Sequence, residues 1–357
     1  MREKFYTSQD GSIRLSEKDI THVCVAPCLY ALLQYLLLLD EEITRRHTFY
    51  FFTDDIPQST IEQLPCCYIH RYPNASITQL VYKRLRKFFI ALFGRLQYPF
   101  LKTAEIYAQD IPDLCIYIGN RPYNLLADAQ ECFSLNMQED SLMYQRMKRK
   151  QKSVLGHLQR WIYGDLYVGY FGNNKWCKTI NLTEENTSSV LAGRDVRIQS
   201  LETMWEKASR SKRNFVMSLF GVTENDAKKL NEKPIVFFSQ PMIEDCKLSE
   251  EEYRDLLERI FELYDSNLIL IKTHPRDKFD YARFFPHIAL FNKSVNSQFL
   301  QLMGLHPKRV ITISSSAIEN FPESVECDYF GAAVHPKILD FFGTSYKPQR
   351  KVNNIKF

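Results

Sequence analysis

The last third of the sequence alternates short apolar runs with helical patterns of apolar residues. Three runs, at residues 235–239, 268–271 and 309–313, predict buried strands. Between the first two, Ser249 and Glu252 form a capping box at the start of an amphipathic helix. The pattern is completed by two shorter strands and a helix, at residues 288–291, 327–330 and 295–303. Buried strands that alternate with helices predict an α/β domain with a parallel sheet.

The first part of the chain opens with the same alternation. An apolar run at residues 21–27 precedes a helix from about Leu29 to Arg46, and a second run follows at 47–52. This order of strand, helix and strand predicts the start of another doubly wound α/β domain. Further short strands are predicted at residues 67–71, 114–118 and 133–137. A polar stretch, 185–233, predicts the connection between the domains, with helices at about 199–210 and 213–220.

The composition is that of a globular protein without a metal or disulfide framework. The 357 residues suffice for two domains with full cores, and a net charge of +4 does not indicate nucleic acid as a partner. Nine cysteines without paired spacing predict reduced thiols in a cytoplasmic protein. The polar N-terminus and the short apolar run Leu29–Leu39 predict neither a signal peptide nor a membrane span.

Residues 81–102 form a basic amphipathic segment. Its apolar positions are interleaved with six basic residues, Lys83, Arg84, Arg86, Lys87, Arg95 and Lys102. A helix of this kind can lie on an anionic lipid surface. The alternative is a helix that faces the core and exposes its basic face to water.

Two strand ends carry residues that suit a phosphate. The strand 268–271 runs into Lys272, Thr273, His274 and Pro275, and the strand 309–313 runs into Ser314, Ser315 and Ser316. Ligands of α/β sheets bind at the carboxyl ends of strands, and the start of a helix offers free N–H groups to an anion. A simple turn and a simple helix cap are the alternatives. We expect an imidazole and serine hydroxyls to hold one phosphate between them.

Carboxylates follow other predicted strands. Glu139 and Asp140 come after the run 133–137, and a carboxylate at such a place can serve as a general base. Acidic residues in the first turn of a helix are the alternative. Glu139 is also a candidate for contact with an acceptor substrate, as is Asp165 in the aromatic, glycine-rich stretch 161–176. Glycine-rich nucleotide loops and an Asp-x-Asp motif are missing from the sequence, so a nucleoside monophosphate leaving group without a metal fits best.

These motifs resemble glycosyltransferase family 52, bacterial sialyltransferases that act on lipooligosaccharide. The likeness rests on Gln240–Asp245 (QPMIED), on the strand followed by His274, Pro275 and Arg276, and on the strand followed by the serines. It extends to VCVAPCLYALL near the N-terminus and to WIYGD at 161–165. Related families carry an Asp/Glu-Asp-Gly motif, and here Ser141 stands in the glycine position after Glu139 and Asp140.

The resemblance implies an α/β protein with two Rossmann-like domains facing a central cleft, the B-type glycosyltransferase architecture. Residues 1–228 would form the acceptor-side domain with its connecting helices, and residues 229–357 would bind CMP-sialic acid. The reaction would invert the anomeric centre and need no cofactor or metal. The acceptor would be a terminal galactoside of lipooligosaccharide or capsule.

The resemblance also implies roles for single residues. His274 would stabilise or protonate the CMP phosphate as an imidazolium, and the general base would be Asp245 or Asp140, with family 52 resembling the Asp245 arrangement. Donor contacts would come from Gln240, Pro241, Lys272, Pro275, Ser314, Ser315 and Ser316.

Several expectations about partners and alternatives stay open. Partners would be the donor, the glycan, a second copy in a homodimer and, through 81–102, the inner face of the cytoplasmic membrane. One alternative function is a glycosyltransferase that uses CMP-Kdo or a UDP- or GDP-hexose. Another is an inactive nucleotide-sugar-binding protein, for which Ser141 in the glycine position leaves room.

Overall fold

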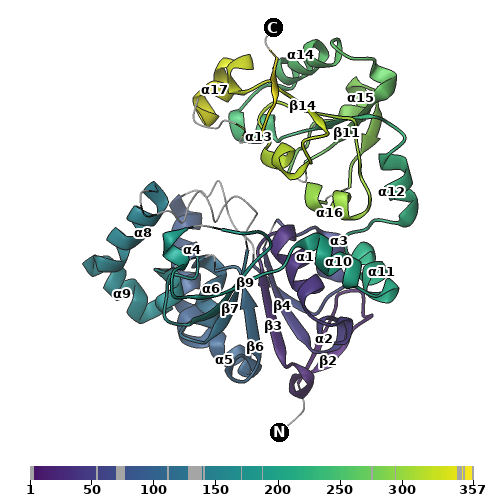
Figure 1. Cartoon of the computed structure of the whole chain (residues 1–357). Helices are drawn as coiled ribbons and strands as arrows, with labels where there is room; N and C mark the ends of the chain where they lie inside the picture. The colour runs from purple at the N-terminus through teal and green to yellow at the C-terminus, as the bar shows by residue number, and fades with distance from the viewer. Residues whose placement is uncertain are drawn as a thin grey trace. The chain divides into compact units, whose positions relative to one another are not determined.

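The computed structural model divides the chain into two units, Met1–Leu219 and Phe220–Phe357 (Figure 1). It describes residues 4–53, 55–69, 77–110, 112–127, 139, 141–169, 171–186, 188–274, 276–293, 295–343, 348 and 350–355. Each unit is an α/β domain with a parallel sheet, so the expected fold class, two Rossmann-like domains, is confirmed.

The second unit, green to yellow in Figure 1, is built on six parallel strands in the order β12-β11-β10-β13-β14-β15. Their bounds are β10 Ile235–Phe238, β11 Ile269–Lys272, β12 Ala289–Phe291, β13 Arg309–Thr312, β14 Glu326–Tyr329 and β15 Asn353–Asn354. Numbered along the chain, this is the 3-2-1-4-5-6 order of a Rossmann sheet, with its switch point between β10 and β13. The strands predicted from the apolar runs in this part of the chain are therefore confirmed.

Helices cover this sheet. They are α12 Glu224–Leu230, α13 Met242–Cys246, α14 Glu250–Phe261, α15 Tyr281–Phe284, α16 Ser297–Leu302 and α17 Pro336–Phe342, with short 3₁₀ turns η6 Ser266–Leu268, η7 Ser316–Asn320 and η8 Ala332–Val334. The predicted capping box is present, since Ser249 accepts from the N–H of Glu252 and the Glu252 carboxylate accepts from the N–H of Ser249. The apolar face of α14 packs into the core with Phe237, Ile269 and Ile271.

The first unit, purple to teal in Figure 1, has seven parallel strands in the order β5-β4-β3-β6-β7-β8-β9. Their bounds are β3 His22–Ala26, β4 Thr48–Thr53, β5 Cys66–Ile69, β6 Glu105–Ala108, β7 Tyr123–Leu126, β8 Cys177–Leu182 and β9 Asp195–Ile198. The order again reverses beside the first of these strands, as in the second sheet. A small antiparallel pair, β1 Phe5–Thr7 and β2 Arg14–Ser16, precedes it.

The helices of the first unit are mostly short. In chain order they are η1 Glu17–Asp19, α1 Leu29–Leu38, α2 Glu41–Arg46, α3 Gln58–Glu62, α4 Ile77–Phe89, the π turn η2 Ile90–Gly94, α5 Arg95–Gln97, η3 Pro99–Lys102, α6 Pro112–Ile118, α8 Leu142–Lys152, α9 Val154–Tyr163, η4 Asp165–Tyr167, η5 Ser189–Leu191, α10 Leu201–Lys207 and α11 Arg210–Leu219. Within the described ranges no helix is both long and apolar enough to cross a membrane.

Some sequence predictions in the first unit are wrong. Residues 114–118, predicted as a strand, belong to helix α6, where Cys115 to Ile118 are buried. A short apolar run does not distinguish a buried strand from a buried helix, and the proline that begins α6 is typical of a helix start. Strands β6 to β9 were not predicted, because they mix apolar residues with polar ones such as Asn124 and Asn181. The predicted strand 133–137 lies outside the described residues.

The boundary between the units falls at Leu219 and Phe220, whereas the resemblance implied one between residues 228 and 229. The contacts around α12 explain the difference. Phe220 packs on Phe299 with their ring centroids 4.8 Å apart, and Lys293 bonds to both Gly221 and Asp226. The segment that begins with Phe220 is thus held by the second unit.

Candidate active site

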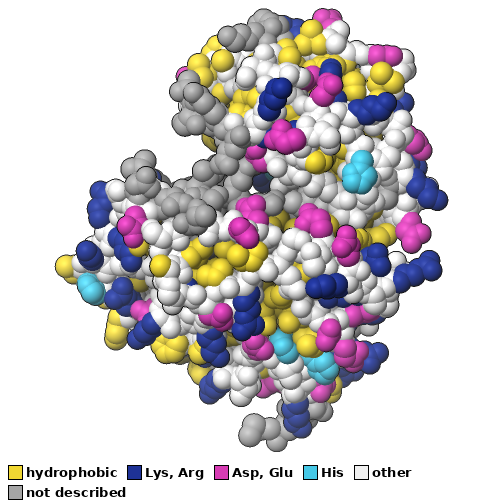
Figure 2. Space-filling view, viewed as in Figure 1, with side chains coloured by type: hydrophobic (Ala, Val, Ile, Leu, Met, Phe, Trp, Pro, Cys, Tyr) yellow, Lys and Arg dark blue, Asp and Glu magenta, His cyan; other side chains and the backbone are white. Residues whose placement is uncertain are grey.

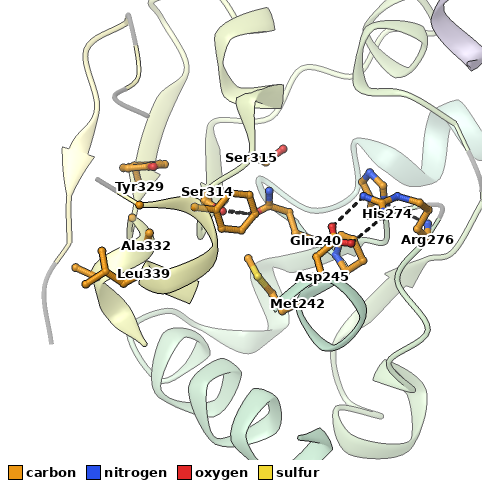
Figure 3. Close-up of a pocket in the computed structure, with 15 residues that line it drawn as sticks. Gln240, Met242, Asp245, His274, Arg276, Ser314, Ser315, Tyr329, Ala332 and Leu339 are labelled. Atoms are coloured by element: carbon orange, nitrogen blue, oxygen red, sulfur yellow. Dashed lines mark hydrogen bonds and ion pairs between the residues drawn. The ribbon is translucent and has the colours of Figure 1, made fainter. Parts of the chain in front are cut away.

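A cavity of about 510 Å³ lies at the carboxyl edge of the second unit's sheet (Figure 3). Strand β10 leads into Gln240 and Asp245, β11 into His274, and β13 into Ser314 and Ser315, and all five residues line the cavity. Because β11, β10 and β13 are neighbours in the sheet, the residues after them converge. The cavity is at the switch point, where α/β sheets bind ligands. His274, Ser314 and Ser315 therefore line one pocket.

His274 is held by its backbone and by one ring nitrogen. Its backbone N–H donates to Oγ of Ser239 at 2.9 Å, and that hydroxyl in turn donates to Asp277. The ring Nδ1 accepts from the backbone N–H of Arg276 at 3.1 Å. A neutral imidazole that accepts at Nδ1 carries its proton on Nε2. In this arrangement Nε2 is the hydrogen-bond donor that His274 has for a ligand.

The pKa of His274 is lowered from 6.5 to about 4, chiefly by burial and then by the positive charges of Arg276 and Lys272. The carboxylate of Asp245 acts in the opposite direction. The sequence led us to expect an imidazolium at this position. The ligand-free site instead favours the neutral ring at pH 7, because the ring is buried beside two cations.

Asp245 forms a bidentate ion pair with Arg276. The two guanidinium nitrogens lie 2.9 Å from Oδ1 and 2.9 Å from Oδ2 of the carboxylate. Arg276 is half exposed and Asp245 is less so. The residue that the resemblance makes a candidate base is therefore engaged at both oxygens, and Arg276 is a cavity residue that our sequence-based set of site residues did not include. Its place immediately after the His-Pro pair was the available signal.

Gln240 links the end of β10 to the end of the neighbouring strand β13. Its Oε1 accepts from the backbone N–H of Ser314 at 2.9 Å and from the Ser314 hydroxyl at 2.8 Å. Ser315 caps η7 by accepting from the N–H of Ala317 at 3.2 Å, so its own O–H can still donate to a ligand. Figure 3 shows Ser314 directed at Gln240, whereas Ser315 is directed away from it.

The other wall of the cavity comes from residues that the sequence did not single out. They end or follow β14 or belong to η8 and α17, and they include Tyr329, Gly331, Ala332, Leu339 and Phe342. Gly331 has a φ of 76°, a conformation that favours glycine. Its N–H donates to the carbonyl of Ile313 at 2.7 Å, which ties this wall to the end of β13. A strand end followed by glycine was a usable signal.

The remaining predicted residues are placed as follows. Lys272 is buried at the end of β11, where it donates to the carbonyl of Thr273, and it does not line the cavity. Burial lowers the pKa of Lys272 to about 7. Pro241 lines the cavity. Pro275, Asp140 and the side chain of Ser316 lie outside what the structure describes.

In the first unit, Glu139 is an exposed turn residue. Asp165 accepts from the Trp176 indole at 2.7 Å and pairs with Arg160 at 3.1 Å, contacts that hold the turn at the end of α9. Neither position carries a direct sign of acceptor binding.

Among the described residues, no three His, Cys, Asp or Glu side chains come together as metal ligands would. The expected independence of a metal stays a prediction.

Comparison with solved structures supports the fold. The chain is similar to the GT-B domain of a Photobacterium damselae sialyltransferase, with a TM-score of 0.54 and 12% identity over 90% of this chain and 96% of that one. It is also similar to a 2,6-sialyltransferase of Photobacterium sp. JT-ISH-224 solved with CMP and lactose (TM-score 0.57, 12% identity, 89% and 75% covered). A Photobacterium phosphoreum α-2,3-sialyltransferase gives a TM-score of 0.51 at 11% identity, with 93% and 98% covered. The fold is therefore of the GT-B type.

The family follows from sequence. The profile of glycosyltransferase family 52 matches residues 118–338, more than half of the chain. The chain belongs to that family, which confirms the resemblance. An uncharacterised protein of Haemophilus influenzae is 33% identical over 174 residues, which cover 48% of this chain and 56% of the relative. The chain thus spans just over half the length of the curated relative that it matches.

Proposed function

We propose that the protein is an inverting, metal-independent sialyltransferase that moves sialic acid from CMP-sialic acid to a terminal galactoside of lipooligosaccharide or capsule. The observation that carries the proposal is the meeting of His274, Ser314 and Ser315 at one cavity. Membership of glycosyltransferase family 52 supports it, and so does the likeness to folds whose proteins are named as sialyltransferases.

In the proposed reaction the bond between the anomeric carbon and the phosphate oxygen breaks, and its electrons leave with CMP. The Nε2–H of His274 donates to the departing phosphate, and Ser315 donates from the other strand end. The acceptor hydroxyl attacks the anomeric carbon from the opposite face, and its proton passes to a carboxylate. Because the transferred sugar carries its own carboxylate, the enzyme has mainly to neutralise the charge of the departing phosphate and to accept one proton.

Arg276 gives the proposed base a means of activation. A carboxylate held at both oxygens by a guanidinium is a poor proton acceptor, and Asp245 is held in this way. The donor brings a phosphate and a carboxylate, and a guanidinium binds either of them bidentately. In our proposal Arg276 turns to the donor and releases Asp245, so that the base becomes available only when the donor is bound. Asp140 stays the other candidate for the base.

A transfer assay tests the proposal. CMP-sialic acid and lactose are incubated with the protein, and the sialylated product is detected by mass spectrometry. We expect product with the wild type and a loss of about 100-fold or more in turnover for His274→Ala. The exposed His287 provides the matched control His287→Ala, which should keep full turnover. Full turnover in His274→Ala would remove His274 from the mechanism.

Variants of the two acids decide which one is the base. Asp245→Asn and Asp140→Asn are compared in the same assay, with Asp255→Asn as the control because Asp255 is exposed on α14. We expect Asp245→Asn to lose transfer and Asp255→Asn to keep it. If Asp140→Asn loses transfer while Asp245→Asn keeps it, the base is Asp140.

Titration with nucleotides separates the donor alternatives. Isothermal titration with CMP, UDP and GDP should show binding of CMP and much weaker binding of the other two. Preference for UDP or GDP would indicate a hexose donor instead. A protein that binds CMP but hydrolyses no donor, even without acceptor, would be a binding protein and not an enzyme.

A further inference from the structure

The loop that carries His274 also carries a carboxylate for which the proposed reaction has no use. Acidic side chains on the surface of both units are scattered among basic ones (Figure 2). Asp277 differs from these, because its Oδ2 accepts from the hydroxyls of Ser239 and Tyr281 and its Oδ1 accepts from the N–H of Phe279 at 3.1 Å. It does not line the cavity. Asp277 is therefore neither a solvated surface charge nor a candidate for the general base.

Ser239 connects this carboxylate to His274. It directly follows β10 and is only 3% exposed. Its hydroxyl donates its one proton to Asp277 and accepts from the backbone N–H of His274 at 2.9 Å. The N–H of Asp277 donates in turn to the carbonyl of His274 at 3.0 Å. Asp277 thus holds the backbone of His274 at the carbonyl directly, and at the N–H through one hydroxyl.

Two buried tyrosines fix the position of Asp277. Tyr281 donates to Oδ2 of Asp277 at 2.8 Å, and its hydroxyl oxygen lies 2.9 Å from that of Tyr253. The Tyr253 hydroxyl also lies 3.2 Å from the backbone carbonyl of Gln240. Because Gln240 directly follows Ser239 in the chain, these contacts form a closed ring that starts and finishes at the end of β10.

We propose that Asp277 and Ser239 are positioning residues, which fix the backbone of His274 and so hold its imidazole in place at the cavity. Neither residue lines the cavity, so both act through His274 and not on the substrate. The inference rests on the proposed function of His274 as a donor to the phosphate of CMP. Precise placement matters for such a donor, because a misplacement of about 1 Å can lower a rate about 100-fold.

A carboxylate suits this place better than an amide. Asp277→Asn has one acceptor oxygen, so it can accept either from the N–H of Phe279 or from the two hydroxyls, but not from all three. Ser239→Ala removes the acceptor for the N–H of His274. Tyr281→Phe removes one of the two hydroxyls at Oδ2 and keeps its ring, so it should have the smallest effect of the three variants.

A double-mutant cycle with His274→Ala tests the proposal in the full chain. His274→Ala keeps the backbone N–H, so the bond to Ser239 can remain while the imidazole is gone. In the wild-type background we expect Ser239→Ala and Asp277→Asn each to weaken the binding of CMP about fivefold in isothermal titration. In the His274→Ala background the same changes should alter the affinity by less than about twofold, because no ring is left to position.

Turnover with CMP-sialic acid and lactose is the second measurement. Asp277→Asn should lower it about tenfold or more in the wild-type background and cause no further loss in His274→Ala. A wild type that binds CMP but transfers no sialic acid would contradict the proposed function. The cycle in CMP affinity would still decide the role of Asp277, so the two failures can be told apart.

Asp328→Asn and Tyr264→Phe are the matched controls. Asp328 is a buried aspartate of the same unit that accepts from the Tyr264 hydroxyl at 2.7 Å and from the Asn353 amide at 2.8 Å, and it does not line the cavity. These variants disturb a similar aspartate–tyrosine pair away from the loop of His274. Their CMP affinity and turnover should equal those of the wild type. If Asp277→Asn does not fold, Ser239→Ala and Tyr281→Phe provide the same test.

Three results would overturn the proposal. The first is wild-type CMP affinity and turnover in both Ser239→Ala and Asp277→Asn. The second is an equal loss in the wild-type and His274→Ala backgrounds, which would mean that the ring of contacts stabilises the fold and not the position of His274. The third is a loss in Tyr264→Phe as large as that in Tyr281→Phe.

Discussion

Binding of CMP should be coupled to the uptake of a proton by His274. In the free site the pKa of His274 is about 4 instead of 6.5, because the ring is buried and lies near Arg276 and Lys272. Each pKa unit corresponds to 1.36 kcal/mol, so protonation is disfavoured by about 3 kcal/mol relative to an imidazole in water. At pH 7 the free protein therefore carries a neutral ring.

A bound phosphate changes this balance. One negative charge about 4 Å from the ring stabilises the imidazolium by roughly 4 kcal/mol at an effective dielectric constant of about 20. This slightly exceeds the cost of about 3 kcal/mol, so the ring should take up part or all of a proton when CMP binds. The sign follows from linkage. Because the bound state holds the extra proton, affinity for CMP should fall as the pH rises through the pKa of the bound ring. Below about pH 4 the free ring is already charged, so the contribution to affinity is fully present there and proton uptake on binding vanishes.

Calorimetry in several buffers measures the coupling. CMP is titrated at one pH in buffers of different ionisation enthalpy, and the dependence of the observed heat on the buffer gives the number of protons taken up. His274→Gln keeps a hydrogen-bond donor but cannot become charged, so it isolates the contribution of the ring from that of the phosphate itself. We expect the wild type to take up more protons than His274→Gln, with His287→Gln equal to the wild type.

Equal proton uptake by the wild type and His274→Gln would refute the reasoning. It would mean either that the phosphate does not approach His274 or that the ring stays neutral in the complex. CMP that binds equally well to both proteins would indicate the first explanation. Weaker binding to His274→Gln at the same proton count would indicate the second.

Two further predictions concern stability. Asp110 is buried and accepts hydrogen bonds from the Tyr123 hydroxyl and from the N–H groups of Phe171 and Gly172, each at 2.7 Å. Asp110→Ala should therefore lower the free energy of unfolding by roughly 2–4 kcal/mol in a denaturant titration. A loss under about 0.5 kcal/mol would contradict this. The hydrogen bond from Lys337 and then the capping box lower the pKa of Glu252 from 4.5 to about 2. Its ionisation therefore stabilises the fold above about pH 4.5, and this contribution is lost as the pH falls towards 2. Glu252→Gln should thus unfold at lower denaturant concentration than the wild type at pH 7 and at the same concentration near pH 2, and an equal difference at both pH values would speak against the assignment.

The sequence alone predicted the second unit closely. Strands β10, β11 and β13 are short apolar runs bounded by polar residues, and the capping box of Ser249 and Glu252 marks the start of α14. Burial and capping are recorded in adjacent residues, so a local pattern is enough to find them. The residues after β11 and β13 could also be expected at one edge, because the ends of parallel strands meet there.

The first unit was harder to predict because its burial is not recorded in local patterns. Strands β7 and β8 carry buried polar residues whose partners lie far away in the chain. The amide of Asn124 donates to Glu105, and that of Asn181 donates to the carbonyl of Leu125. From the sequence alone, a polar residue in a short segment indicates a loop, because the distant partner that allows its burial in a strand is not known. Helix α6 shows the opposite case. Its apolar residues are buried on all sides, so the sequence has no helical alternation of apolar and polar positions there.

Sequence patterns were enough to assign the family, the fold class and the positions of His274 and the serines at strand ends. The folded chain was needed to see that Arg276 holds both oxygens of Asp245, that α17 lines the cavity and that α9 and α4 both expose apolar side chains. The two sets of features differ in the range of the interactions behind them. Periodicity and capping act over a few residues, whereas an ion pair between loops or an uncovered helix face depends on how distant segments pack.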